Sequence, residues 1–379
     1  MKNWEIKNLG EVIEIRNGKN QQGVLSETGR YKIMGSAGNV MGYATDFICE
    51  AGTTIIGRKG NISKPIYIDE KFWIVDTAFG FYPKYENEID KRLVYYLCLG
   101  IDFKSMNRGT TIPSLVKSEL QVITIKYPKS LPEQQRIVTI LDKAFAAIAK
   151  AKTNAEQNLK NAKELFDVHL HKYYTNKERG WEEKKLKEVA EYFNGLTYSP
   201  KDVSDEGIIV LRSSNIQNDE LDFKDIVRVK LTVKEKIIVK EGDILMCSRN
   251  GSARLVGKTA TIKKLNEEMT FGTFMMIVRS KYNPYLSWYF KSTDFRNQIK
   301  VGENTMINQI TRYMLDDVII SFPPIEIQDH VVKELNVLAK KIKKLEAIYT
   351  QKINDLEELK KSLLQKAFSG ELTANEVLV

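Results

Sequence analysis

Two long segments of the chain repeat apolar residues at alternating intervals of four and three positions. One begins at Leu131 with LPEQQRIVTILDKAFAAIAK, and the other begins at Ile325 with IEIQDHVVKELNVLAKKIKK. A four–three repeat places the apolar residues in one stripe along a helix and, sustained over several heptads, is typical of coiled coils. Each segment predicts a helix of roughly 44 residues, about 65 Å long.

The two stripes correspond position by position at an offset of 194 residues. The first consists of Ile137, Leu141, Ala144, Ile148, Ala151, Ala155, Asn158, Ala162, Leu165 and His169. The second consists of Val331, Leu335, Leu338, Ile342, Leu345, Tyr349, Lys352, Leu356, Leu359 and Leu363. Small side chains interdigitate well with large ones, so the alanine-rich first stripe suits the leucine-rich second. We expect the helices to pair with each other; alternatively, each packs on its own domain.

The connection between the helices predicts their relative direction. A second globular segment begins at Trp181, directly after the first helix. In a parallel pair this segment would have to bridge the whole length of the helix. We therefore expect an antiparallel coiled coil with a pseudo-two-fold axis, in which a stiff rod holds two globular domains apart.

The globular segments are also duplicated. WEIKNLGEVIEIRNG from Trp4 is similar to WEEKKLKEVAEYFNG from Trp181, and AGTTIIGRKG from Ala51 is similar to EGDILMCSRNG from Glu241. TIPSL from Thr111 aligns with MINQI from Met306. A repeat this long indicates two copies of a domain. We predict an α+β fold with mixed α/β domains at 1–130 and 178–323, a first helix at 131–177, and a second helix with a C-terminal tail at 324–379.

Composition narrows the class of protein. The 379 residues carry 58 Lys and Arg against 49 Asp and Glu, a net charge of +9, which favours a polyanionic partner. The three cysteines are isolated, as expected in a reducing compartment. The N-terminal sequence lacks the apolar run of a signal peptide, and we find no run long enough to span a membrane, so we expect a cytoplasmic protein.

The sequence offers little support for catalysis. The chain has only three histidines. His169 and His171 are two positions apart on a helix and point to different faces, and His330 lies at a helix start, so no histidine-based metal cluster is expected. GSARLVGKT, from Gly251 to Thr259, approaches the phosphate-binding pattern GxxxxGK[ST] but has Ser252 in place of the first glycine. An enzyme that uses this loop is one alternative function. A coiled-coil adaptor, or a general nucleic-acid-binding protein without sequence specificity, is another.

Polar and basic residues in the expected loops suit DNA. Residues 224–264 contain 11 Lys and Arg against 4 Asp and Glu. Arginine pairs with guanine, asparagine pairs with adenine, and lysine suits phosphates. The candidates in the second domain are Arg212, Ser213, Ser214, Asn215, Ser248, Arg249, Asn250, Ser252, Arg254 and Lys258. Those in the first are Ser36, Asn39, Arg58, Lys59, Asn61, Lys64, Asn107, Arg108, Thr110 and Thr111. Alternatively, these residues merely form solvated turns between strands.

These residues also carry a resemblance to a known family. TTIPSLVKSELQVITIKYPKSLPEQQRIVTILD from Thr110, SLLQKAFSGELT from Ser362, and the paired GRKG and SRNG loops resemble the specificity subunit of type I restriction–modification systems. The resemblance covers essentially the whole chain. The second helix start reads PPIEIQDHVV, which departs from the fuller PEQQ form at Pro132 and leaves the contacts there open.

The resemblance implies a protein without catalysis of its own. Each domain would read one half of an asymmetric, bipartite site in double-stranded DNA, and the helices would set the spacing. Two modification subunits, which methylate adenine with S-adenosylmethionine, would dock on the exposed helix faces near Lys143, Lys150, Lys340 and Lys344. Restriction subunits would use ATP and Mg to translocate and cleave DNA, so this chain itself would bind no cofactor or metal.

Overall fold

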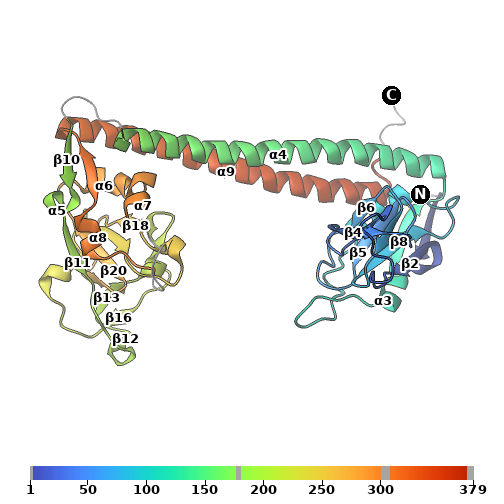
Figure 1. Cartoon of the computed structure of the whole chain (residues 1–379), viewed down its shortest axis with the longest axis horizontal. Helices are drawn as coiled ribbons and strands as arrows, with labels where there is room; N and C mark the ends of the chain where they lie inside the picture. The colour runs from blue at the N-terminus through green and yellow to red at the C-terminus, as the bar shows by residue number, and fades with distance from the viewer. Residues whose placement is uncertain (1–2, 176–180, 300–307, 374–379) are drawn as a thin grey trace. The chain divides into compact units, whose positions relative to one another are not determined.

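The computed structural model describes residues 3–175, 181–299 and 308–373. The chain divides into two compact units: unit 1 comprises Met1–Glu156 and Thr350–Val379, and unit 2 comprises Gln157–Tyr349. Each unit contains one β-rich domain together with parts of the long helices α4 (Leu131–Thr175) and α9 (Ile325–Ser369). The colours of Figure 1 follow the chain from its N-terminus to its C-terminus. The predicted domain limit at 177–178 and the MI of MINQI lie outside the described residues.

The domain of unit 1 consists of short strands and short helices. Its elements are β1 (Trp4–Asn8), α1 (Leu9–Val12), β2 (Ile13–Asn17), β3 (Tyr31–Met34), β4 (Val40–Ala44), β5 (Thr53–Gly57), β6 (Ile66–Ile68), β7 (Phe72–Ile74), β8 (Ala78–Pro83), α2 (Lys91–Gly100), α3 (Lys117–Gln121) and β9 (Thr124–Pro128). One antiparallel sheet has the order β2-β8-β5-β6, a second sheet has the order β4-β3-β7, and β1 pairs with β9. Every residue of β5 is buried, and its β-branched run suits a strand inside a sheet.

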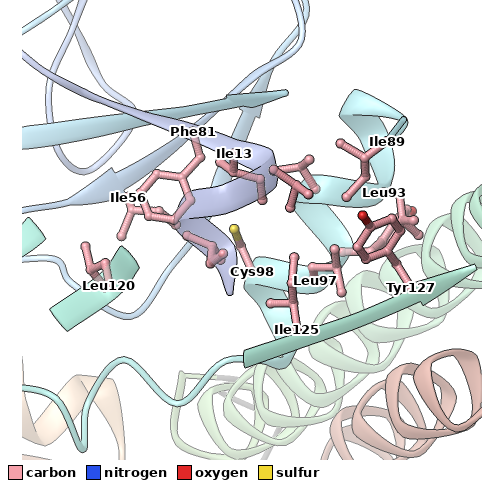
Figure 2. Packing of buried hydrophobic residues seen from close by; sticks show 14 of the residues in the cluster. Ile13, Ile56, Phe81, Ile89, Leu93, Leu97, Cys98, Leu120, Ile125 and Tyr127 are labelled. Carbon is pink, nitrogen blue, oxygen red and sulfur yellow. The ribbon is translucent and has the colours of Figure 1, made fainter. Parts of the chain in front are cut away.

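The main core of unit 1 lies between the four-stranded sheet and helix α2. Ile13, Ile56 and Phe81 come from the sheet, while Leu93 and Cys98 come from α2 (Figure 2). Burial raises the pKa of the Cys98 thiol, so this cysteine is an inert core residue. The sheet and α2 therefore form a rigid base from which the connections between strands project.

The domain of unit 2 has a closely related set of elements. They are β10 (Glu182–Lys185), α5 (Leu186–Val189), β11 (Glu191–Asn194), β12 (Val203–Ser204), β13 (Ile208–Leu211), β14 (Ile216–Gln217), β15 (Glu220–Leu221), β16 (Arg228–Val229), β17 (Ile244–Cys247), β18 (Thr259–Thr261), β19 (Met269–Phe271), β20 (Met275–Arg279), α6 (Asn283–Tyr289), α7 (Thr293–Ile299), α8 (Arg312–Asp316) and β21 (Ile319–Phe322). Short 3₁₀ turns lie at Pro200–Asp202, Ser213–Asn215, Glu235–Ile237 and Ala253–Leu255.

Strand order confirms the predicted duplication. The sheet β11-β20-β17-β18 of unit 2 repeats β2-β8-β5-β6 of unit 1, and the pair β10-β21 repeats β1-β9. The parallel pair β13-β19 likewise repeats β3-β7. The hairpin β14-β15 is an addition in unit 2, and its turn residues Asn218 and Asp219 have φ of 50° and 62°. Asparagine and aspartate tolerate this left-handed conformation better than most residues.

Each long helix has a buried glutamine in its first turn, and the two glutamines are equivalent in the repeat. Gln134 is 0% exposed; its Oε1 accepts a hydrogen bond from Asp90 N at 2.7 Å, and its Nε2 donates to Glu88 O and Pro128 O, both at 2.8 Å. Gln328 is 2% exposed and donates from Nε2 to Pro323 O at 2.8 Å. These bonds tie each helix start to its domain, which explains why the same start occurs twice.

The helices run antiparallel in both units, as predicted. In unit 1 the start of α4 packs with the end of α9, because Ile137 and Leu141 share a core cluster with Leu364 and Ala367. In unit 2 the end of α4 packs with the start of α9, because Leu170 and Tyr174 share a cluster with Val331 and Leu335. The ion pairs Lys152–Glu357 at 2.6 Å in unit 1 and Lys163–Glu346 at 3.7 Å in unit 2 keep the same register. Each domain core is thus completed by both helices.

The buried faces do not follow a strict heptad. Ile137, Leu141, Ile148, Ala155, Leu335 and Ile342 are buried, and Ala144, Ala151, Leu338 and Leu356 are half-buried. Leu345 and Leu359, which the heptad placed on the seam, are 38% and 47% exposed, and Leu165 is 49% exposed. Ala162 of the predicted stripe is buried, and so are Leu170, Leu364 and Ala367, which lie off the predicted stripes. A straight α-helix has 3.6 residues per turn, so its contact face moves away from a repeat of 3.5 unless the helices supercoil.

The motif FSGEL ends α9 with a left-handed cap. Gly370 has φ of +85°, and the backbone amides of Glu371 and Leu372 both donate to Lys366 O, at 3.0 and 3.1 Å. Glycine adopts this conformation without a Cβ penalty. A Cβ at Gly370 would also lie 3.4 Å from the ring of Trp4. The cap therefore returns the chain onto the domain of unit 1.

Candidate nucleic-acid interface

In unit 1 the two predicted DNA-contacting loops meet at the end of β5. Gly60 N donates to Pro113 O at 2.8 Å, Leu115 N donates to Arg58 O at 2.9 Å, and Lys59 forms a β-bridge with Ser114. On the other side, the amides of Arg58 and Lys59 both donate to Thr77 O, at 2.8 and 3.0 Å. The loop after β5 is therefore held between two neighbouring backbone segments.

Unit 2 repeats this arrangement at the end of β17. Asn250 N donates to Asn308 O at 3.2 Å, Ile310 N donates to Ser248 O at 2.7 Å, and Arg249 forms a β-bridge with Gln309. The amides of Ser248 and Arg249 both donate to Phe274 O, at 3.0 and 3.1 Å. Asn250 Nδ2 also lies 3.4 Å from Ser213 Oγ, which brings the loop after β13 to the same place.

These backbone bonds correct the correspondence between the loops by one residue. The GRKG and SRNG motifs align Arg58 with Arg249, but Lys59 is the residue that bridges Ser114 as Arg249 bridges Gln309. Strand register agrees, because Gly57 pairs with Ala78 at the end of β5 as Cys247 pairs with Met275 at the end of β17. Lys59 and Arg249 are therefore structurally equivalent, and Arg58 corresponds to Ser248.

Two of the predicted base contacts are buried, and a third is exposed but makes hydrogen bonds within its own loop. Asn215 is 1% exposed; its Oδ1 accepts from Arg212 N at 2.8 Å, and its Nδ2 donates to Asp222 O and Asp225 O, both at 2.9 Å. Ser248 is 7% exposed at the end of β17. Asn107 Oδ1 accepts from Gly109 N and Ser114 N, at 2.9 and 2.8 Å, so its amide shapes the loop between α2 and α3. An amide with its hydrogen bonds already made has little left to offer a base.

The candidate arginines differ in the side chains that their guanidinium groups contact. Arg108 pairs with Glu119 at 2.9 Å, and this hydrogen-bonded partner raises the pKa of the guanidinium. Arg212 pairs with Asp225 at 2.7 Å. Arg58 and Arg249 instead lie over phenyl rings, with Cζ 5.9 Å from the centroid of Phe79 and 5.3 Å from that of Phe274. Arg254 is exposed after the loop of β17.

The remaining candidates lie on the surface of these loops. Asn39, Lys59, Lys64, Thr110, Thr111 and Ser252 are exposed, and Ser36, Asn61, Ser213, Ser214 and Asn250 are half-buried. Ser36 and Asn39 belong to the turn between β3 and β4, in which Gly35 N donates to Asn39 O at 2.9 Å. A Cβ at Gly38 in this turn would lie 2.6 Å from Ile66 Cδ1, so the turn packs against β6.

The resemblance of Gly251–Thr259 to a phosphate-binding loop is not supported. A phosphate-binding loop connects a strand to a helix. Here a short 3₁₀ turn at Ala253–Leu255 is followed by strand β18, and Thr259 is 3% exposed in that strand. Lys258 Nζ donates to Ile216 O at 2.9 Å and also lines a cavity of about 850 Å³ in unit 2. Lys263 and Lys291 line the same cavity, where they pair with Glu220 at 3.5 Å and Asp219 at 3.0 Å, so its walls carry charges of both signs.

Other sites for chemistry are not evident in the described part of the chain. Residues 3–175, 181–299 and 308–373 contain no group of three His, Cys, Asp or Glu side chains placed to hold a metal ion. His330 Nε2 lies 3.5 Å from Glu334 Oε1 on the surface of α9, where it forms an ordinary helix-face pair. None of the described helices has the length and apolarity needed to cross a membrane.

Several residues that sequence reasoning did not select complete the loop arrangement. Pro113, Ser114, Asn308 and Gln309 supply the backbone that holds the loops after β5 and β17. Phe274 is 53% exposed directly before β20. From the sequence, a phenylalanine next to a strand is expected in the hydrophobic core. Only the exposure of Phe274 in the structure identifies it as part of the loop surface.

Comparison with known proteins identifies the family of this chain. A family model described as the type I restriction modification DNA specificity domain matches residues 1–159 and 178–358. The chain belongs to this family. It is 28% identical over 203 residues to the type I restriction enzyme EcoKI specificity subunit of Escherichia coli strain K12, a match that covers 51% of this chain and 44% of that protein.

Other members of the family match more or less of the chain. The StySPI specificity subunit of Salmonella potsdam is 29% identical over 203 residues, covering 51% of this chain and 44% of that protein. The aligned region thus spans less than half the length of the EcoKI and StySPI subunits. The MjaVIII specificity subunit of Methanocaldococcus jannaschii is 23% identical over 403 residues, covering 97% of this chain and 93% of that protein.

Solved structures share the fold. A chain from a study of complex assembly and conformational transition of the type I R-M system has a TM-score of 0.80 at 16% identity, over 98% of this chain and 99% of that chain. The HsdS subunit from Thermoanaerobacter tengcongensis has a TM-score of 0.58 at 17% identity, over 98% and 97% of the two chains. The predicted architecture, two β-rich domains joined by two long helices that pack against each other, is confirmed.

Proposed function

We propose that this chain is the DNA sequence-recognition subunit of a type I restriction–modification complex, and that each domain reads one half of an asymmetric bipartite site. The observation that carries the proposal is the pair of loops at the end of β5, repeated at the end of β17 with different side chains. Two equivalent surfaces with unlike residues suit two unlike half-sites, whereas identical subunits read palindromes.

The division of labour follows from the residues at each loop. Exposed Lys59, Lys64 and Arg254 suit phosphates, which supply affinity that falls as salt rises. Arg58 and Arg249 suit base edges, because a guanidinium can bond guanine O6 and N7 together. The chain then needs no catalytic residue, since its task is to place partner subunits on chosen DNA in the cytoplasm.

The partners and cofactors follow from the family. Two modification subunits would methylate adenine with S-adenosylmethionine, and restriction subunits would use ATP and Mg to translocate and cleave DNA. The exposed lysines Lys143 and Lys150 of α4 and Lys340 and Lys344 of α9 would lie where modification subunits dock. The helix pair would fix the distance between the half-sites.

Methylome sequencing of a host that expresses this chain with its modification subunits tests the proposal. We expect a bipartite, adenine-methylated motif with two unlike halves and a fixed gap. In binding assays with the purified complex, duplexes that carry this motif should compete above random duplex as salt rises. A methylome without such a motif, together with equal competition by all duplexes, would instead indicate an adaptor or a nonspecific nucleic-acid-binding protein.

A further inference from the structure

One exposed pair of side chains in unit 2 combines a guanidinium with an aromatic ring at the tip of a fixed loop. Arg249 is exposed with its Cζ 5.3 Å from the ring centroid of Phe274, and Phe274 is 53% exposed. A cation over a phenyl face is attracted by the ring quadrupole, by about 0.5–1 kcal/mol at exposed sites. The ring therefore limits the orientations of the guanidinium.

The backbone on both sides of Arg249 is held as well. Its amide donates to Phe274 O at 3.1 Å, and the residue bridges Gln309 on the opposite side. The next residue, Asn250, donates to Asn308 O at 3.2 Å. The Cα of Arg249 is thus fixed between two strand-like segments, and only its side chain reaches outward. Such preorganisation lowers the entropy lost when a side chain binds a partner.

The partner of an arginine side chain determines how many of its N–H groups are still available to bind a ligand. Arg228 of the same unit gives two donors to Glu267, at 2.7 and 3.0 Å, and this partner lowers the pKa of Glu267. Within the described residues, Arg249 has no carboxylate within ion-pair distance. A phenyl ring orients a guanidinium without occupying its N–H groups. The planar fork of Arg249 therefore stays available for two acceptors side by side, the arrangement that guanine O6 and N7 present in the major groove.

We propose that Arg249 reads a guanine in the half-site of unit 2 and that Phe274 is the residue that positions it. The proposal rests on the function proposed above and adds a base and two residues to it. The exposed edge of the Phe274 ring would contact the neighbouring base, as apolar side chains contact the methyl group of thymine.

Unit 1 supplies an internal comparison. Lys59 occupies the position of Arg249, and Thr77 occupies that of Phe274. The arginine of unit 1 stands one residue earlier, over Phe79, which is only 1% exposed. Successive residues of an extended segment point to opposite sides, so Arg58 and Arg249 leave their loops in different directions. Changes at Arg249 and Phe274 should therefore leave the half-site of unit 1 as it is.

The test uses the complete chain assembled with its modification subunits, and it measures methylation and binding on every single-base variant of the site. Arg249→Lys keeps the charge but removes the fork, and we expect it to reduce discrimination at one guanine of the unit 2 half-site by about 5- to 100-fold. Phe274→Leu keeps an apolar side chain but removes the ring face, and we expect a smaller loss at the same base pair, about 2- to 5-fold.

Arg228→Lys is the matched control, because it makes the same chemical change in the same unit at a guanidinium that Glu267 already holds. It should leave base preference unchanged, and hydrogen exchange of unit 2 should show that all three variants fold. Two results would overturn the proposal: unaltered preference in Arg249→Lys, or a uniform loss of affinity for all sequences, which indicates a phosphate contact. Absence of any bipartite motif with the unsubstituted chain would instead refute the function on which the proposal rests.

Discussion

At the scale of single residues, hydrogen bonding separates side chains that can meet DNA from side chains that build the loops. Asn215 and Asn39 are the same residue type, and both were candidates. Asn215 is 1% exposed and bonds three backbone groups, whereas Asn39 is exposed at the tip of a turn. Most buried polar groups form hydrogen bonds within the protein, so residue type alone does not establish a role in recognition.

Replacement of Asn215 should therefore affect stability before specificity. Asn215→Ala leaves Arg212 N and the carbonyls of Asp222 and Asp225 without their partner, and each buried group left unpaired costs roughly 1–3 kcal/mol. We expect faster hydrogen exchange in residues 209–229 and a lower urea midpoint for unit 2. Ser214→Ala is the control, with an expected change within about 0.5 kcal/mol. A variant with normal exchange but altered base preference would contradict this role.

At the scale of elements, the buried glutamines connect the long helices to the domains with unequal strength. Gln134 makes three hydrogen bonds with backbone groups of unit 1. Gln328 makes one with Pro323 O, and its buried Oε1 has no partner among the described residues. The replacement of PEQQ at 132–135 by EIQD at 326–329 therefore coincides with a less fully bonded junction.

The two junctions should respond differently to the same substitution. Gln134→Ala leaves Asp90 N, Glu88 O and Pro128 O unpaired, and we expect a loss of about 2–4 kcal/mol in the stability of unit 1. Gln328→Ala should cost unit 2 about 1 kcal/mol. Hydrogen exchange measured separately in peptides from α2 and α6 distinguishes the units. Equal losses in both variants would show that the difference in hydrogen bonding between the two glutamines does not contribute to stability.

At the scale of the whole molecule, each long helix begins in one domain core and ends in the other. Ile137 and Leu170 of the single helix α4 belong to different core clusters, and so do Val331 and Leu364 of α9. A helix cannot change its rise per residue without breaking hydrogen bonds. The number of residues in the pair is therefore the quantity expected to set the gap between half-sites.

Paired insertions test this expectation. One heptad inserted between Lys152 and Lys163 in α4, and another between Glu346 and Glu357 in α9, would keep both flanking ion pairs in register. The pair would lengthen by roughly 10 Å, close to three base pairs at about 3.4 Å each. We expect the methylated motif to keep both halves and gain a gap of about that length. Insertion in α4 alone should destabilise the pair, and an unchanged gap in the paired variant would rule out the role of the helices as a spacer.

The sequence by itself determined the features that depend on local pattern and on repetition. The apolar period predicted two long helices, their offset of 194 residues predicted two related domains, and the position of Trp181 predicted their antiparallel course. Apolar periodicity predicts a helix and its buried face, because apolar residues at helical spacing form one stripe that packs away from water. The heptad repeat predicted that Leu345 and Leu359 lie on the buried seam, but both are exposed. A helix that is not wound to 3.5 residues per turn gradually rotates its contact face away from a heptad stripe.

Only the tertiary structure decided which loops meet and which side chains remain free. The contacts between the segments at Arg58 and Ser114, and between those at Arg249 and Gln309, join residues far apart in the chain through backbone groups, which carry no residue-specific signal. The same bonds show that the residue of unit 1 equivalent to Arg249 is Lys59 and not Arg58, which the sequence motifs had aligned with it. Hydrogen bonding and exposure depend on every neighbour in space, so the internal role of Asn215 and the outward position of Phe274 followed from the fold alone.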